Sequence, residues 1–98
     1  MTIAKTFEDG VLTVIPEGRL DSAAGDEFSA FMDENFTDDV KKLVFDFGGL
    51  DFISSKGLRI IVSIYKNLEG REMEIVNANA SVTEILRISG FLKIFNVR

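Results

Sequence analysis

The sequence predicts a single α/β domain in which a mixed β-sheet packs against helices. Runs rich in β-branched and aromatic residues alternate with segments whose apolar residues recur at helical spacing. With 98 residues, the chain is long enough for one hydrophobic core and too short for two. The apolar fraction of 46% and the nine phenylalanines indicate a packed globule rather than a disordered chain. We therefore treat residues 1–98 as one domain.

A β-hairpin is expected at the N-terminus. The β-rich runs 2–7 and 11–15 are separated by Glu8-Asp9-Gly10, and Asp-Gly between two such runs favours a tight turn. Pro16 is expected to end the second strand, because proline cannot donate a hydrogen bond to a sheet ladder. The chain then leaves the sheet and enters its first helix.

This first helix starts at Asp21 or Ser22, since either side chain can accept bonds from the free N–H groups of a first turn. Its apolar residues fall on one face at helical spacing, and they are Phe28, Phe31, Met32 and Phe36. The run Thr37-Asp38-Asp39 breaks the pattern.

The clearest helix covers residues 58–68 and is followed by Gly70, a predicted left-handed C-terminal cap. Its apolar residues recur at i, i+3, i+4, i+7 and i+10, and they are Leu58, Ile61, Val62, Tyr65 and Leu68. A third helix opens on a capping box, Ser81 with Glu84, and runs to Ser89 before Gly90.

The remaining strands are short and apolar. Residues 43–47 form a nearly continuous apolar run, which is typical of an interior strand, and residues 72–76 alternate as a strand does. An apolar patch at 91–95 is expected to be a last short strand. The order is β-β-α-β-α-β-α plus this short C-terminal strand, with right-handed crossovers. We expect the core to contain Phe45, Phe47, Leu58, Ile61, Val62 and Ile75.

Composition excludes several classes of function. The chain has no cysteine and no histidine, so disulfides, thiolate metal sites and the commonest general base are absent. The net charge is −5 and the basic residues are scattered, which argues against nucleic acid as a partner. No segment predicts a membrane span or a signal peptide, and we expect a cytoplasmic protein.

The turn Ser54-Ser55-Lys56-Gly57 is the candidate functional site, because it joins a buried segment to the start of a helix. One interpretation is that a serine here is only an N-cap. The other is that an exposed serine at a helix start is a phosphorylation site, where the dipole favours a phosphate group. Asp21 ends a strand-like run at the start of the preceding helix, and a cap is again the simplest interpretation of its role.

Catalytic interpretations have less support. Ser55 does not lie in a G-x-S-x-G elbow, and the neighbouring Lys56 points elsewhere on a helix, so a Ser–Lys pair is not expected. The glycines form no phosphate-binding loop. Asp46 and Asp51 are expected to be solvated or capping residues rather than an acid–base pair. We predict a non-enzymatic protein without cofactor or metal.

Three segments together resemble the STAS domain, the domain of sulphate transporters and anti-sigma factor antagonists. Residues 43–59, Leu-Val-Phe-Asp-Phe-Gly-Gly-Leu-Asp-Phe-Ile-Ser-Ser-Lys-Gly-Leu-Arg, are similar to its signature. Gly18-Arg19-Leu20-Asp21 is similar to the Gly-x-Leu-Asp element after its second strand, and residues 88–95 are similar to its closing segment. The resemblance covers nearly the whole chain and is greatest to the stand-alone bacterial antagonists.

This resemblance implies a partner-switching function. Ser55 corresponds to the serine that an anti-sigma factor serine kinase phosphorylates in the family, and a serine phosphatase reverses the modification. The unphosphorylated form binds the kinase and the phosphorylated form is released. The expected binding surface comprises Asp21, Ser54, Ser55, Lys56, Gly57 and Arg59.

The chain departs from the family pattern at two positions of the turn. Ser54 stands where many members have aspartate, and Lys56 replaces a small residue, so that it either pairs with the phosphate or points to solvent. The common final helix of the family is also short or absent. The competing hypothesis is a docking subunit that is not phosphorylated, such as an accessory domain of a membrane transporter.

Overall fold

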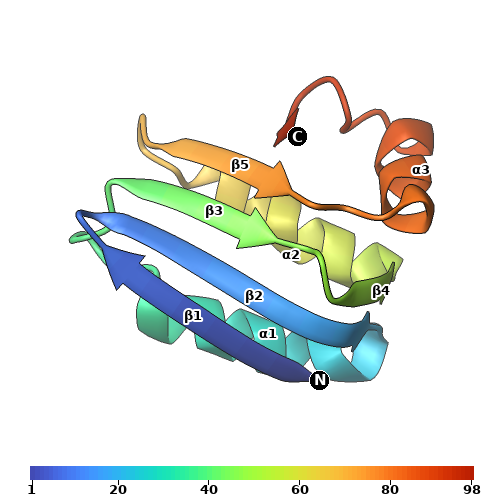
Figure 1. Ribbon diagram of the computed structural model, residues 1–98, viewed down its shortest axis with the longest axis horizontal. Helices are drawn as coiled ribbons and strands as arrows, with labels where there is room; N and C mark the ends of the chain where they lie inside the picture. Colours follow the sequence, from blue (N-terminus) through green and yellow to red (C-terminus); the bar gives the residue numbers. More distant parts are fainter.

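The computed structural model describes all 98 residues as one α/β unit (Figure 1). Its elements are β1 (Thr2–Glu8), β2 (Val11–Leu20), α1 (Ser22–Asn35), β3 (Lys42–Asp46), β4 (Leu50–Ile53), α2 (Ser55–Lys66), β5 (Glu72–Val76), α3 (Ala80–Ile88) and β6 (Asn96–Val97). The predicted α/β class and element order are confirmed, with the short strand β4 in addition.

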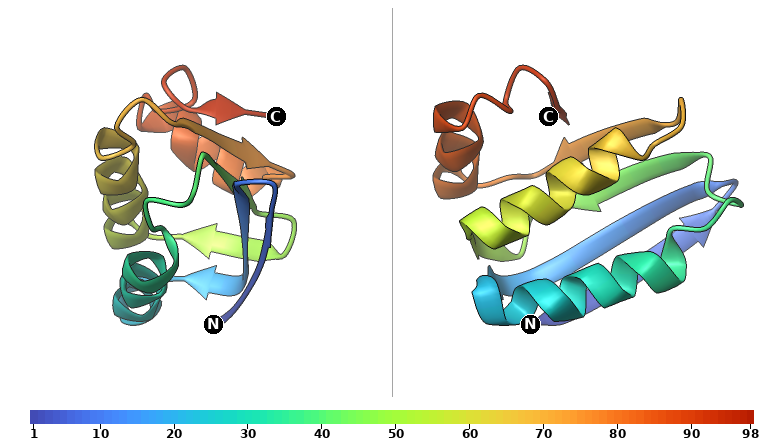
Figure 2. Two further views of the ribbon diagram at one scale, coloured as in Figure 1. Left: turned by 90° about the vertical axis from the view of Figure 1, so that its left-hand side faces the viewer. Right: turned by 180° about the vertical axis from the view of Figure 1, so that it is seen from behind.

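The sheet is mixed, with the strand order β1-β2-β3-β5-β6. Only the β1–β2 pair is antiparallel, and its turn has Asp9 and Gly10 both at positive φ (52° and 80°), as a tight hairpin requires. Helices α1 and α2 lie side by side on one face of the sheet, and α3 lies beyond the end of β5 (Figure 2). Strand β4 stands apart from the main ladder and pairs only with the end of β2.

Strand β2 runs through Pro16 to Leu20, so the prediction that Pro16 ends it was wrong. The stretch 11–14 of β2 pairs with β3, and the stretch 18–20 pairs with β4. Pro16 lies between these two stretches, where no parallel strand pairs with β2. Its missing N–H group therefore leaves no hydrogen bond of the sheet unmade. The N–H of Gly18, two residues on, points to that same side and donates to the Gly49 carbonyl at 2.9 Å.

The cap of α3 is Asn79, not the predicted Ser81. The Asn79 side chain accepts from the Val82 N–H at 2.8 Å and donates to the Leu50 carbonyl at 3.0 Å, so it also ties α3 to β4. Glu84 does not reach back to the helix start. It pairs with Arg87, and this hydrogen bond holds the pKa of Glu84 below its ordinary value.

The ends of two helical segments also differ from expectation. Helix α2 ends at Lys66 with Asn67 as its cap, so Gly70 (φ +86°) belongs to the turn before β5. The apolar patch 91–95 is a turn, not a strand, and β6 follows it. Strand β6 is held against β5 in part by a side-chain bond. The buried Glu74 carboxylate on β5 accepts a hydrogen bond from Arg98, the residue after β6, at 3.0 Å.

The core lies between the sheet and the two helices α1 and α2. Phe45, Phe47, Ile61 and Ile75 have no exposed surface and Leu58 is 8% exposed, as predicted. Val62 is only half-buried and packs against the core from outside it, so the prediction that it is a core residue is met only in part. Phe28 and Met32 of the α1 face are buried, whereas Phe31 and Phe36 are partly exposed.

Replacing Ile61 with alanine should lower the free energy of unfolding by about 2–5 kcal/mol, because the cavity would open at the centre of the helix–sheet interface. Val62→Ala is the matched control on the same helix and should cost less, since its side chain is half-buried. Chemical denaturation of both variants checks this. Equal losses would mean that the buried face of α2 is wrongly identified.

Candidate functional site

The carboxyl ends of β2 and β4 bring Asp21 and Ser54 next to each other. The two strands are parallel, with Leu20 beside Ile53, and the Ser54 N–H donates to the Leu20 carbonyl at 2.8 Å. Each strand leads directly into a helix, so α1 and α2 begin side by side and run in the same direction. The positive ends of two helix dipoles therefore share one edge of the sheet.

Two side chains at this edge cap the helices, and Ser55 does not. Asp21 Oδ1 accepts from the Ala24 N–H at 2.9 Å, and Ser54 Oγ accepts from the Gly57 N–H at 3.1 Å. Asp21 and Ser54 are thus the N-caps of α1 and α2. Ser55 is the first residue of α2, its side chain is exposed, and its hydroxyl group makes no hydrogen bond within the chain. Ser55 therefore has no structural task that would occupy its hydroxyl group.

Gly57 is required by the close approach of α2 to the end of β2. A Cβ atom at this position would lie 2.7 Å from Leu20 Cγ and 3.1 Å from the Leu20 carbonyl oxygen. The first contact is shorter than packed atoms tolerate, and the second is tighter than most packed contacts and involves backbone, which moves aside less easily than a side chain. Gly57 thus supports the site by letting the first turn of α2 sit against β2.

Lys56 is tied to the neighbouring helix. Its Nζ lies 2.8 Å from Asp26 Oδ1 on α1, and its aliphatic chain lies over Gly25, where a Cβ would be 3.1 Å from Cδ and Cε. Lys56 is therefore directed toward α1 and paired with Asp26, rather than pointing freely to solvent. An exposed pair of this kind contributes little stability, but it fixes where the ammonium group lies.

A shallow groove between α1 and α2 continues from this edge, with a volume of about 260 Å³. Met32, Ile60 and Ile64 give it an apolar floor, and Lys56 and Arg59 form part of its rim. Sequence analysis included Arg59 but missed the groove, because its two walls come from segments about 30 residues apart. The structure thus brings all six predicted residues to one edge of the molecule and adds a groove beside them.

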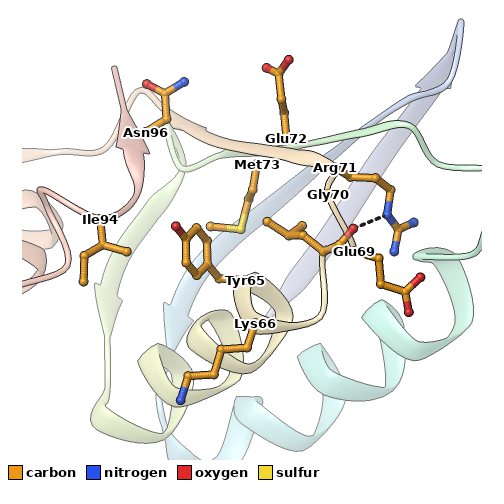
Figure 3. Close-up of a pocket in the computed structure, with 10 residues that line it drawn as sticks. Tyr65, Lys66, Glu69, Gly70, Arg71, Glu72, Met73, Ile94 and Asn96 are labelled. Carbon is orange, nitrogen blue, oxygen red and sulfur yellow. Dashed lines mark hydrogen bonds between the residues drawn. The ribbon is translucent and has the colours of Figure 1, made fainter.

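A larger hollow, of about 630 Å³, lies at the opposite end of α2 (Figure 3). Tyr65 and Met73 line it together with Ile94, and Arg71 closes one side by donating to the Leu68 carbonyl at 2.7 Å. None of the predicted site residues contributes to it. The structure shows no cluster of acidic residues that could hold a metal ion, and no helix has the length and apolarity to cross a membrane.

The family model for the STAS domain matches residues 2–98. The chain belongs to the STAS domain family. It is 35% identical over 91 residues to BtrV of Bordetella bronchiseptica, provisionally named an anti-sigma factor antagonist, covering 91% of this chain and 78% of that protein. It is 34% identical over 91 residues to the anti-sigma F factor antagonist of Paenibacillus polymyxa, covering 90% and 78%.

Solved structures show the same STAS fold. The anti-sigma factor antagonist SpoIIAA in its unphosphorylated form superposes with a TM-score of 0.84 at 18% identity, covering 99% of this chain and 88% of that one. The phosphorylated form of SpoIIAA from Bacillus superposes with a TM-score of 0.76 at 17% identity, covering 99% and 91%. The predicted family is therefore confirmed.

Replacing Gly57 with alanine should lower the free energy of unfolding by about 1–3 kcal/mol, because the added methyl group overlaps Leu20. Helix propensity alone would favour alanine by about 1 kcal/mol, so a loss of stability reports the steric contact. Ser63→Ala, at an exposed position of the same helix, is the control and should be close to neutral. Denaturation that shows Gly57→Ala to be more stable than wild type would contradict the close packing.

Proposed function

We propose that this STAS domain is an anti-sigma factor antagonist in a partner-switching pathway. It binds an anti-sigma factor serine kinase while Ser55 is unphosphorylated and is released when Ser55 carries a phosphoryl group. A serine phosphatase restores the binding form. The observation that carries this proposal is the difference between the two serines at the start of α2. Ser54 caps the helix, whereas Ser55 has an exposed hydroxyl group without a hydrogen bond.

The comparisons support the same class of function. Both curated relatives bear the name of anti-sigma factor antagonist, and each aligns over about nine-tenths of this chain. SpoIIAA, which has the same fold, is known in unphosphorylated and phosphorylated forms. The chemistry needed is simple: the kinase moves the γ-phosphoryl group of a nucleoside triphosphate to Ser55 Oγ, whose proton leaves, and the phosphatase hydrolyses the ester.

The fold should tolerate this modification. A phosphoserine adds a charge of about −1.5 to −2 at pH 7. On the first residue of α2 that charge lies beside the positive end of the helix dipole and near free N–H groups, which favour an anion. The side chain already points to solvent, so no buried contact is lost when the phosphoryl group is added.

The complex with the kinase, in contrast, should not tolerate phosphorylation of Ser55. A partner that covers Ser55 with an apolar or acidic surface would have to strip water from a dianion and would repel it. Each 1.4 kcal/mol of lost affinity weakens binding tenfold. A difference of about 5.5 kcal/mol between the two forms would change occupancy from 99% to 1%. Phosphorylation can thus control binding without unfolding the domain.

The alternative function is static docking, in which Ser55 is never modified. The groove between α1 and α2 favours it, because an apolar floor beside the turn can hold a partner without any change in charge. An accessory subunit of a membrane transporter is one such module. The two functions differ in a single property, the dependence of partner affinity on the charge at Ser55.

Substitutions at the two serines should separate these functions. Ser55→Ala should bind the kinase but accept no phosphate, and Ser55→Asp should bind weakly because it places a permanent negative charge at the interface. Ser54→Ala is the matched control: it removes a cap, at a cost of about 0.5–2 kcal/mol in stability, and should remain a substrate. Phosphate incorporation by the kinase and titration of each variant against it measure these effects.

Two results would reject the switch. One is phosphorylation of Ser55→Ala to the wild-type extent, which would place the modification elsewhere. The other is wild-type affinity of Ser55→Asp, which would leave static docking as the better account.

A further inference from the structure

Two cations follow Ser55 on α2, and only one of them has an acidic partner. Lys56 follows Ser55 in the chain, and Arg59 lies four residues on, one turn along α2. The Lys56 ammonium is bound to Asp26 at 2.8 Å. The Arg59 side chain is exposed and takes part in none of the ion pairs or side-chain hydrogen bonds of the structure. Arg59 is thus the cation of the first turns of α2 that has no acidic partner.

The positions of Ser55 and Arg59 on α2 favour contact. Residues four apart on a helix are neighbours on one face, with Cβ atoms about 5–6 Å apart. An acidic group that precedes a basic group by four residues is in the more favourable of the two orders. Adjacent residues such as Ser55 and Lys56 point in directions about 100° apart, and Lys56 would also have to leave Asp26.

The chemistry of the two groups favours Arg59 as well. A guanidinium offers several N–H donors in a planar fork, which matches two oxygens of a phosphoryl group, whereas an ammonium acts as a point charge. Ser55 has no other cation on its own face of the helix within one turn. A phosphoryl group on Ser55 therefore has one unpaired cation within a turn of it on α2.

We propose that Arg59 is the residue that pairs with the phosphoryl group of Ser55, while Lys56 stays with Asp26. This inference rests on the proposed phosphorylation of Ser55 and names its regulation. In the unphosphorylated form, Arg59 is a free cation at the rim of the α1–α2 groove and is available to an acidic group of a partner. Phosphorylation then acts twice: it adds a dianion, and it withdraws the unpaired Arg59 cation from the same surface.

The pairing can be tested without the kinase, in full-length protein that carries phosphoserine at position 55 through encoded incorporation. The second pKa of a phosphoserine is about 6 and is read from the ³¹P chemical shift during a pH titration. A paired cation stabilises the dianion and lowers this pKa. Arg59→Gln should therefore raise the titration midpoint by about 0.2–0.7 pH units, the range of an exposed ion pair.

Lys56→Gln is the matched control, since it removes the same charge next to Ser55. Because Asp26 already holds that cation, the midpoint should change by less than half as much as in Arg59→Gln. Arg59→Lys should restore part of the shift. An unchanged midpoint in Arg59→Gln, or a shift in Lys56→Gln as large as that in Arg59→Gln, would overturn the proposal. Failure of the kinase to modify Ser55 would reject the proposed function and leave this measurement interpretable.

Discussion

The site depends on one backbone contact, the parallel pairing of the end of β2 with β4. The Ser54 N–H donates to the Leu20 carbonyl at 2.8 Å, and this bond places the starts of α1 and α2 side by side. Gly57 lets α2 approach close enough for the bond to form, because any larger residue would meet Leu20. The two caps, the exposed Ser55 and the groove between the helices all follow from this arrangement.

The arrangement separates the residues that stabilise the fold from those of the proposed switch. The residues that hold the edge together are Leu20, Ser54 and Gly57, all at least partly buried. The residues of the proposed switch, Ser55 and Arg59, are exposed, and their side chains form no hydrogen bond or ion pair within the chain. A charge added to such a surface alters what can bind there and leaves the packed core unchanged. This is the physical requirement for a switch that acts on affinity rather than on folding.

Much of the fold was predictable from the sequence, because local patterns determine most of its helices and strands. The helical spacing of residues 58–68 gave the buried face of α2, and the Asp9-Gly10 turn gave the hairpin. Contacts between distant segments were not predictable in the same way. Strand β4 has only four residues, without clean alternation, and its sole partner is the continuation of β2 beyond Pro16.

Long-range contacts also decided the side-chain roles. Asn79 and Ser81 are both good caps by type, and the bond from Asn79 to the Leu50 carbonyl selects the first. Ser54 and Ser55 could not be told apart as caps until the Gly57 N–H was seen to donate to Ser54. The four-residue spacing of Ser55 and Arg59 is visible in the sequence. The pairing of Lys56 with Asp26, 30 residues away, which leaves Arg59 as the unpaired cation at the start of α2, is not.

The most direct measurement compares one protein in two chemical states. Calorimetric titration of the anti-sigma factor kinase with unphosphorylated and with stoichiometrically Ser55-phosphorylated protein gives the two affinities, and denaturation gives the two stabilities. The account predicts a loss of affinity of at least tenfold with little change in the free energy of unfolding. Equal affinities, or a loss that is matched by unfolding of the phosphorylated form, would contradict it.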